Sequence, residues 1–253
     1  MSTNREENWM VYPCLMGDHQ AWISYDHAVG DYIDKMTGRQ MLGMMVELKN
    51  PHENGMPSAD EVEELEKVDD VIDRYMRMHN GCYAGRITVD GARHYRCYVA
   101  WPEELIIDML QQIQVETGYE PGYYLEDDMD RKAYWEDLFP DRISWEVCQN
   151  IRLIETIRES GDDLETPRHI DHFIYFDSEE KAQDFIAWAE QSEYELESAG
   201  PSEDESPRFL VRLGHQCSLE LFEISGHTIA LLEAADQFGG EYDGWETEVV
   251  NES

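Results

Sequence analysis

The second half of the chain alternates strand-like and helix-like segments, and their order restricts the fold more than any other feature. HIDHFIYF predicts a strand, and residues 177–191 predict a helix capped by Asp177 and Glu180, with its apolar side chains on one face. YELESA and PRFLVRLGH predict two strands, and EYDGWETEV predicts the last strand after a second helix. The order β-α-β-β-α-β predicts a ferredoxin-like α+β sandwich.

One boundary in this half is open. CSLELFEI either continues as a strand or belongs to a long helix that Ser218 caps. The buried face of that helix would carry Phe222, Ile229 and Leu232. Gly226 inside the helix costs roughly 1 kcal/mol, which a long helix tolerates. We favour the helix over a strand at residues 219–226.

The first half begins with three strand-like runs, WMVYPCL, QAWISY and MLGMMVEL. A helix is predicted from Ala59 to Met78, because apolar residues recur there at helical spacing. Ser58 and Glu61 form a capping box at its start. The first half therefore starts with strands and then turns to a helix.

A hairpin follows, in which Asp90 and Gly91 join CYAGRITV to RHYRCYVAW. A second helix begins near Pro102 and ends at Gly118, and a last strand covers residues 119–125. This order predicts an α+β domain with an antiparallel sheet and two helices on one face of it.

Pro140 and Asp141 mark the expected boundary between two domains, residues 1–140 and 141–253. Apolar residues from Ile143 onward recur at helical spacing until Gly161, which predicts a helix that links the domains.

The charge of the chain restricts its partners. The 253 residues include 19 Lys and Arg against 56 Asp and Glu, a net charge of −37. Residues 141–253 hold 7 basic and 28 acidic residues, a net charge of −21. Such a surface repels nucleic acid and anionic membranes, so we expect a protein partner with a basic surface. Adaptation to a saline habitat is an alternative origin of the acidity.

The cysteines and the N-terminal residues indicate a cytoplasmic protein. The N-terminal sequence MSTNREENWM has no apolar segment of the kind that signal peptides carry. No Cys-x-x-Cys spacing occurs, so we expect reduced thiols and no disulfide framework. The five cysteines are Cys14, Cys82, Cys97, Cys148 and Cys217.

Histidines in the second half suggest a metal site, but their spacing argues against it. His169 and His172 point to opposite faces of a strand, so they cannot share one ion unless the strand has a bulge between them. His215 and Cys217 lie on one side of an extended segment, but no further cysteine pair completes a zinc set. We expect no metal and no cofactor.

Motifs of catalysis are absent as well. The acidic residues 126–130 lack the glycine and terminal glutamate of a calcium loop, so we expect them to be solvated. No nucleophile elbow, phosphate-binding loop or dinucleotide fingerprint occurs. We therefore expect a protein that is not an enzyme.

The segment Glu241 to Trp245 has two interpretations. Gly244 permits a bulge, and Trp245 can pack under the terminal helix, which gives the segment a structural role. Tyr and Trp beside acidic groups are also typical of interface anchors. The structural interpretation is favoured.

At these residues the second half resembles the bacterial family of the regulator of ribonuclease E activity B. The resemblance covers nearly all of residues 155–250, through GDDLETPRHIDHFIYF, SEYEL, FLVRL and GGEYDGWET. It implies a ferredoxin-like fold and the binding and restraint of a ribonuclease, without catalytic residues. The candidate partner-binding or family-motif residues are Asp162, Asp163, His172, Tyr242, Asp243, Gly244 and Trp245.

The first half resembles the bacterial domain of unknown function 695. The resemblance is carried by YPCLMGDHQAWISY, VELKNPHENGMPSADEVEELE, GCYAGRITVDGARHYRCYVA and residues 135–140.

Two hypotheses for the function follow. In the first, an acidic cytoplasmic regulator binds and inhibits ribonuclease E or a related RNA-processing protein through its second domain. In the alternative, a small-ligand-binding protein or enzyme has its site between the two domains, where clefts commonly form.

Overall fold

The computed structural model describes residues 6–36, 40–202 and 208–250. The chain divides into two compact units, residues 1–144 and 145–253, each with its own antiparallel sheet. The boundary falls in the first turn of helix α4 (Arg142–Glu159). Both units have the α+β composition that the sequence predicts.

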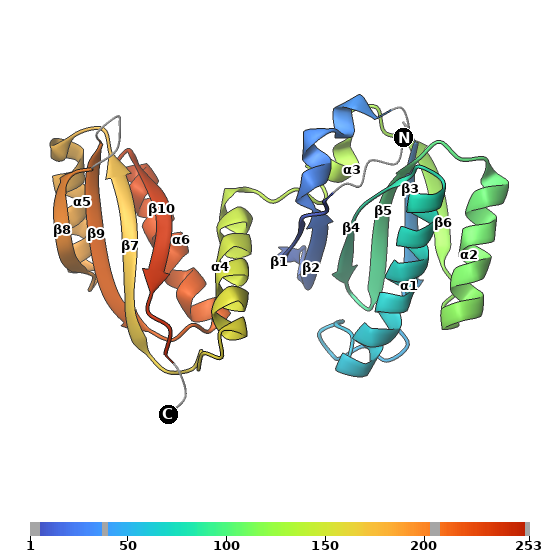
Figure 1. Ribbon diagram of the computed structural model, residues 1–253, viewed down its shortest axis with the longest axis horizontal. Coiled ribbons are helices and arrows are strands. Elements are labelled where there is room, and N and C mark those ends of the chain that lie inside the picture. Colours follow the sequence, from blue (N-terminus) through green and yellow to red (C-terminus); the bar gives the residue numbers. More distant parts are fainter. Residues whose placement is uncertain (1–5, 37–39, 203–207, 251–253) are drawn as a thin grey trace. The chain divides into compact units, whose positions relative to one another are not determined.

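The first unit contains a six-stranded sheet with the strand order β1-β2-β4-β5-β3-β6 (Figure 1). Every pairing in it is antiparallel. The strands are β1 (Trp9–Met16), β2 (His19–Asp26), β3 (Gln40–Glu47), β4 (Cys82–Val89), β5 (Ala92–Val99) and β6 (Gly122–Asp127), and the helices are α1 (Ala59–Met78), α2 (Glu103–Thr117) and α3 (Lys132–Trp135), with 3-10 turns η1 (His27–Asp31) and η2 (Ile33–Lys35).

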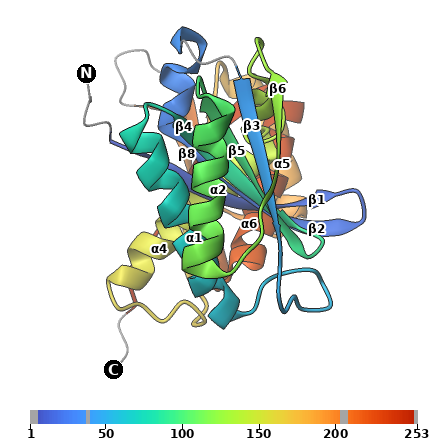
Figure 2. The same cartoon turned by 90° about the vertical axis from the view of Figure 1, so that its right-hand side faces the viewer.

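Helices α1 and α2 lie side by side on one face of this sheet (Figures 1 and 2). Their apolar faces and the inward side chains of β3 and β5 form one core, which confirms the predicted arrangement. Burial of this face is what keeps α1 helical, since a helix in isolation is only marginally stable. The fully buried side chains of this core include Leu42, Met44, Leu65, Ile72, Tyr95, Ile106 and Ile113.

The predicted hairpin turn is present between β4 and β5. Asp90 and Gly91 have φ of 47° and 73°, so both central residues of the turn are left-handed. Two-residue hairpins favour this geometry because its twist matches that of the strands.

Glu61 was predicted to complete a capping box, and the structure gives it a different role. Ser58 does cap α1, because its hydroxyl accepts a hydrogen bond from the Glu61 N–H at 3.3 Å. The Glu61 carboxylate, however, is buried and accepts hydrogen bonds from the N–H of Lys49 and, at 3.1 Å, of Asn50. The Tyr119 hydroxyl donates a further hydrogen bond at 2.9 Å. Glu61 thus fixes the connection between β3 and α1.

The last strand of this unit was expected to begin at residue 119 but begins at Gly122. Tyr119 follows the left-handed Gly118, and its buried ring turns toward α1 instead of joining the sheet. The hydrogen bond from its hydroxyl to Glu61 accounts for the difference.

The expectation of a solvated acidic loop at residues 126–130 is wrong for Asp128. This side chain is buried and accepts hydrogen bonds from the N–H groups of Lys132 and Ala133, at 2.8 and 3.0 Å. The Tyr98 hydroxyl donates a third, at 2.7 Å. Asp128 therefore satisfies the free N–H groups at the start of α3.

The second unit has a four-stranded antiparallel sheet with the order β10-β7-β9-β8. The first strand lies between the last and the third, which is the split arrangement of the predicted ferredoxin-like fold. The strands are β7 (Arg168–Phe176), β8 (Glu195–Pro201), β9 (Phe209–Cys217) and β10 (Gly240–Thr247), and the helices besides α4 are α5 (Glu179–Gln191) and α6 (Leu221–Gln237).

The helix favoured over a strand at residues 219–226 is present as α6, but its start differs from the prediction. Glu220 occupies the N-cap position, and Ser218 lies two residues earlier, where it accepts the N–H of Glu220 at 3.2 Å. Phe222 was expected inside and is 73% exposed, because the buried face runs through Ile224 and Thr228.

The predicted capping pair of α5 is absent. Ser178 occupies the N-cap position without a side-chain hydrogen bond, and the Asp177 carboxylate instead accepts a hydrogen bond from Lys181. Both residues are on the surface.

A buried amide joins three elements of the second unit. Asn150 of α4 is 1% exposed, and its amide nitrogen donates to the hydroxyls of Ser225 and Thr228 on α6, at 3.1 and 2.8 Å. Its amide oxygen accepts the indole N–H of Trp245 on β10 at 2.8 Å. An indole can only donate, so it fixes which way the amide is turned.

We predict that Glu61→Ala lowers the free energy of unfolding of the first unit by about 2–4 kcal/mol, because buried N–H donors lose a charged acceptor. Urea denaturation of the full chain measures this. Glu63→Ala, at an exposed position of the same helix, is the matched control and should change stability by less than about 0.5 kcal/mol. Equal effects of the two substitutions would contradict the role given to Glu61.

We predict that Asn150→Ala costs about 2–3 kcal/mol of stability, since the indole N–H of Trp245 loses its buried acceptor. Trp245→Phe removes the same hydrogen bond from the other side. The double variant should therefore lose less than the sum of the two single losses, by at least about 0.5 kcal/mol in a thermodynamic cycle. Additive losses would show that the two side chains act independently. Glu155→Ala, on the exposed side of α4, serves as the control.

Candidate functional site

A row of histidine and tyrosine side chains lies on the helix-covered face of the second sheet. His172, on the central strand β7, is fully buried. Its Nδ1 is 2.8 Å from the Tyr242 hydroxyl on β10, and its Nε2 is 3.1 Å from Nδ1 of His215 on β9. The row therefore crosses three neighbouring strands.

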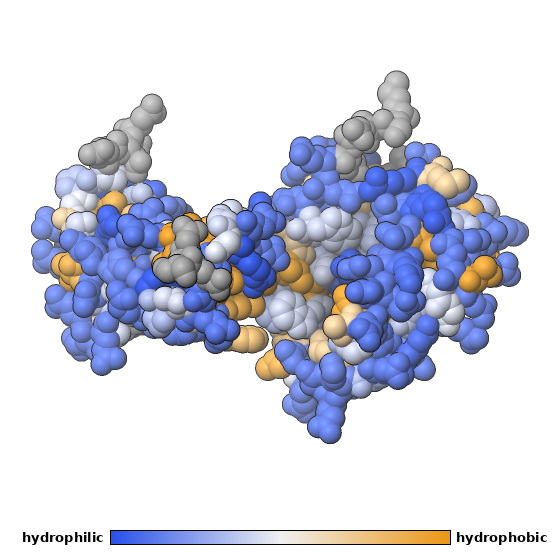
Figure 3. Space-filling view, turned by 60° about the horizontal axis from the view of Figure 1, so that its bottom comes forward, coloured by the Kyte–Doolittle hydropathy of each residue, from blue (hydrophilic) through white to orange (hydrophobic). Residues whose placement is uncertain are grey.

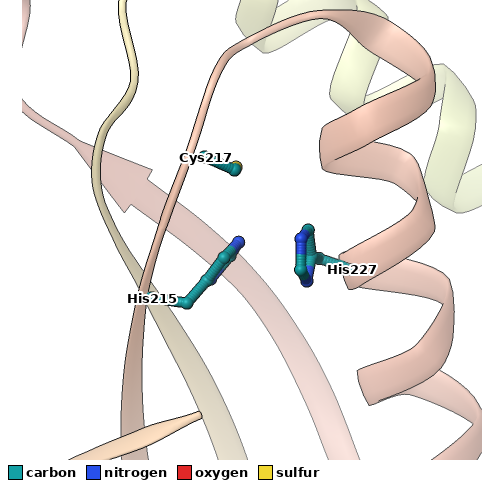
Figure 4. Close-up of side chains that lie close together, drawn as sticks. All are labelled: His215, Cys217 and His227. Atoms are coloured by element: carbon teal, nitrogen blue, oxygen red, sulfur yellow. The ribbon is translucent and has the colours of Figure 1, made fainter. Parts of the chain in front are cut away.

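The row ends in a cluster of His215, Cys217 and His227. His215 and Cys217 are two residues apart on β9, so they share a face of the strand. His227 comes from α6, which packs over this face. One ligand atom of each residue lies within 4.8 Å of the others, and Figure 4 shows the tip of the His215 ring directed between Cys217 and His227.

Burial keeps the cluster uncharged. It lowers the pKa of His215 to about 4 and that of His172 well below its usual range. Burial also lowers the pKa of His227 and raises the pKa of the Cys217 thiol to about 12. At neutral pH the three imidazoles are neutral and the thiol is protonated.

One ring nitrogen of the row has no hydrogen-bond partner among the described residues. Nε2 of His215 is buried and has no hydrogen-bond partner among the described residues. When His172 Nδ1–H donates to Tyr242, His172 Nε2 accepts from His215 Nδ1–H, and His215 Nε2 carries a lone pair. That lone pair points at Cys217 and His227. Nitrogen and sulfur ligands of this kind could hold a transition metal.

The two predicted aspartates lie at the turn before β7. The Asp162 side chain is buried, and its carboxylate accepts hydrogen bonds from Arg168 at 2.6 Å and from the N–H of Val250 at 2.5 Å. Asp163 is half-buried; its carboxylate accepts a hydrogen bond from the Thr166 hydroxyl at 2.5 Å, and its carbonyl accepts one from Arg168. Both residues hold the turn that precedes the strand.

The predicted residues of β10 divide between two faces. A bulge at Asp243 shifts the register, so Tyr242 and Trp245 both face the helices although they are three residues apart. Gly244 has φ of 133°, a backbone conformation that L side chains rarely adopt, which confirms the proposed bulge. Tyr242 and Trp245 are buried, Asp243 is exposed, and Gly244 is half-buried.

The opposite face of this sheet carries no described helix of the second unit, and we call it the free face. Its half-buried aromatic side chains are Phe173 and Tyr175 of β7. The Arg212 guanidinium lies 5.7 Å from the Phe173 ring and donates two hydrogen bonds to Asp171, at 2.9 and 2.7 Å. Arg208 lies 4.0 Å from the Tyr175 ring. The hydrogen bonds from Arg212 lower the pKa of Asp171.

The sequence prediction about His169 and His172 is confirmed, since the two residues lie on opposite faces of β7. His169 is on the free face, 3.2 Å from Asp171, whereas His172 is inside. His227 and Asn150 were missed, because each meets its partners only when α6 and α4 pack on the sheet. The two-residue spacing of His215 and Cys217 was the one local signal of the cluster.

Within residues 6–36, 40–202 and 208–250, no helix is long and apolar enough to cross a membrane.

Comparison with curated proteins finds no match for this chain. A solved structure described as an unknown protein from Galdieria sulphuraria is 9% identical, with 83% of this chain and 99% of that chain covered and a TM-score of 0.22. A second, described as a hypothetical protein, is 6% identical, with 95% of each chain covered and a TM-score of 0.22.

Two family models match the chain, one in each half. The model described as regulator of ribonuclease activity B matches residues 148–247, and the model of a family of unknown function, DUF695, matches residues 7–139. The second of these covers more than half of the 253 residues. The chain therefore belongs to the DUF695 family of unknown function, and its second half matches the regulator of ribonuclease activity B family.

Proposed function

We propose that this protein regulates an RNA-processing ribonuclease, ribonuclease E or a relative of it, by binding the enzyme through the second unit. The observation that carries the proposal is the match of residues 148–247 to the regulator of ribonuclease activity B family. The binding is of protein to protein, and the regulator lowers the activity of the enzyme.

The charge of the chain supports a basic protein partner. Residues 141–253 carry a net charge of −21, and hydrophilic side chains cover most of the face of each unit that Figure 3 shows. An acidic surface attracts a basic one over a distance of about a Debye length and repels RNA. Enzymes that process RNA need basic surfaces to hold the phosphate backbone, so such a surface is available on the partner.

The free face of the second sheet supplies a contact surface for this partner. Phe173 and Tyr175 form its aromatic centre, beside Arg208 and Arg212. Aromatic and arginine side chains dominate the binding energy of many protein interfaces. Acidic residues surround the centre, at Glu197, Glu241 and Glu246.

We predict that the full-length protein binds the ribonuclease at low ionic strength and slows its cleavage of RNA. Electrostatic attraction accelerates association, so the association rate should fall at least about tenfold between about 0.01 and 0.15 M salt. Stopped-flow or surface-binding kinetics measure this rate. The proposal is wrong if the purified protein neither binds nor slows the enzyme at low salt.

We predict that Phe173→Ala weakens binding roughly 10- to 30-fold, the loss typical of a central aromatic anchor. The matched control is Phe222→Ala, which removes an exposed aromatic side chain from α6, on the helix-covered side of the sheet. It should leave the dissociation constant unchanged. If Phe222→Ala weakens binding and Phe173→Ala does not, the contact surface lies on the helices and not on the free face.

A further inference from the structure

The cluster of His215, Cys217 and His227 has no part in the proposed regulation, because it lies inside the second unit, away from the free face. Its two first members are nearly fully enclosed, with 7% and 2% of their surfaces exposed. Buried polar groups normally have hydrogen-bond partners, yet Nε2 of His215 has none among the described residues. A bound metal ion would give this unpaired nitrogen a partner, and the neighbouring thiol and second imidazole could bind the same ion.

The three ligand atoms are spaced closely enough for one ion. In a four-coordinate zinc site the Zn–N and Zn–S bonds of about 2.0–2.3 Å place neighbouring ligand atoms about 3.3–3.6 Å apart. Here the three ligand atoms lie within 4.8 Å of one another. Side-chain rotations that move ligand atoms closer together by at most about 1.5 Å would therefore give the spacing of a zinc site.

Both imidazoles are held by hydrogen bonds at their other nitrogen, as metal-binding histidines usually are. Nδ1 of His215 is 3.1 Å from His172, and Nδ1 of His227 is 3.0 Å from the Tyr194 hydroxyl. These contacts orient each ring and leave Nε2 of each as the free ligand atom. His172 is in turn held by Tyr242, so the supporting network reaches three strands.

The charge of the surroundings suits a divalent cation. Glu223 precedes His227 by one turn of α6, so its carboxylate lies on the same side of the helix, where it accepts a hydrogen bond from the Ser218 hydroxyl. A Cys217 thiolate and the Glu223 carboxylate together balance two positive charges. Soft sulfur with two imidazoles is a ligand set that zinc accepts in tetrahedral sites, with Glu223 or a water molecule as fourth ligand.

We propose that His215, Cys217 and His227 form a zinc-binding site between β9 and α6. The ion ties the end of β9 to α6, so zinc stabilises the second unit. This site is independent of ribonuclease binding and is testable on the isolated, full-length protein.

The experiment titrates Co²⁺, as a spectroscopic substitute for zinc, into reduced, metal-free, full-length protein. The expected result is one equivalent of Co²⁺ per chain, with the visible absorption of a tetrahedral site and a thiolate-to-cobalt charge-transfer band that Zn²⁺ abolishes. Cys217→Ser should remove the charge-transfer band and weaken Zn²⁺ binding at least about 100-fold. Cys148→Ser, at a buried cysteine of α4 outside the cluster, should leave both unchanged.

Two further variants guard against loss of folding, which circular dichroism detects. His227→Gln changes a half-buried ligand and leaves the thiol, so it should weaken Zn²⁺ binding while the protein stays folded. Tyr194→Phe removes only the support of His227 and should weaken Zn²⁺ binding roughly 10- to 100-fold with unchanged stoichiometry. The proposal is overturned if wild-type protein gives no tetrahedral Co²⁺ spectrum, or if the charge-transfer band persists in Cys217→Ser.

Discussion

The carboxamide of Asn150 sets the arrangement of the second unit. Helix α4 precedes the β-α-β-β-α-β pattern and could pack on it in several rotations, because apolar side chains alone discriminate weakly between them. Three hydrogen bonds, to two hydroxyls of α6 and the indole of β10, are satisfied in one rotation only. Any other rotation leaves buried polar groups unpaired, which costs more than a hydrogen bond gains. The packing of Trp245 beside Ile154 and Ile224 follows from this choice.

Much of the fold could be predicted from the sequence, since strand alternation, helical periodicity and turn residues are local signals. Helix α1, the turn at Asp90 and Gly91 and the bulge at Gly244 are examples. The prediction failed where a side chain prefers a distant partner to a local one. Glu61 binds the connection after β3 and Tyr119 instead of capping its own helix, and Asp128 binds Tyr98 and the start of α3 instead of water.

The candidate sites show the same difference between local sequence signals and contacts that form only in the folded chain. The family-motif residues were named from a resemblance of the sequence, and in the structure the side chains of Asp162, His172, Tyr242 and Trp245 lie inside the unit, where they support its fold. The histidine cluster was not predicted because His215 and His227 lie on different elements, β9 and α6. The two side chains approach each other only when α6 packs on the sheet. Strand β7 contributes to both the buried histidine cluster and the free face, since His172 points toward the cluster and the adjacent Phe173 points to the free face. One strand thus serves the interior network and the free face through its alternation.

The bulge at Asp243 has a consequence for how this strand tolerates changes in length. Tyr242 and Trp245 occupy the same face only because one residue between them is unpaired. Deletion of that residue would leave the composition of the strand almost intact, yet it would turn one of the two rings to solvent. Either the hydrogen bond to His172 or the one to Asn150 would then be lost. Homologous chains should therefore vary in residue type at position 243 but not in the number of residues that separate the two aromatic rings.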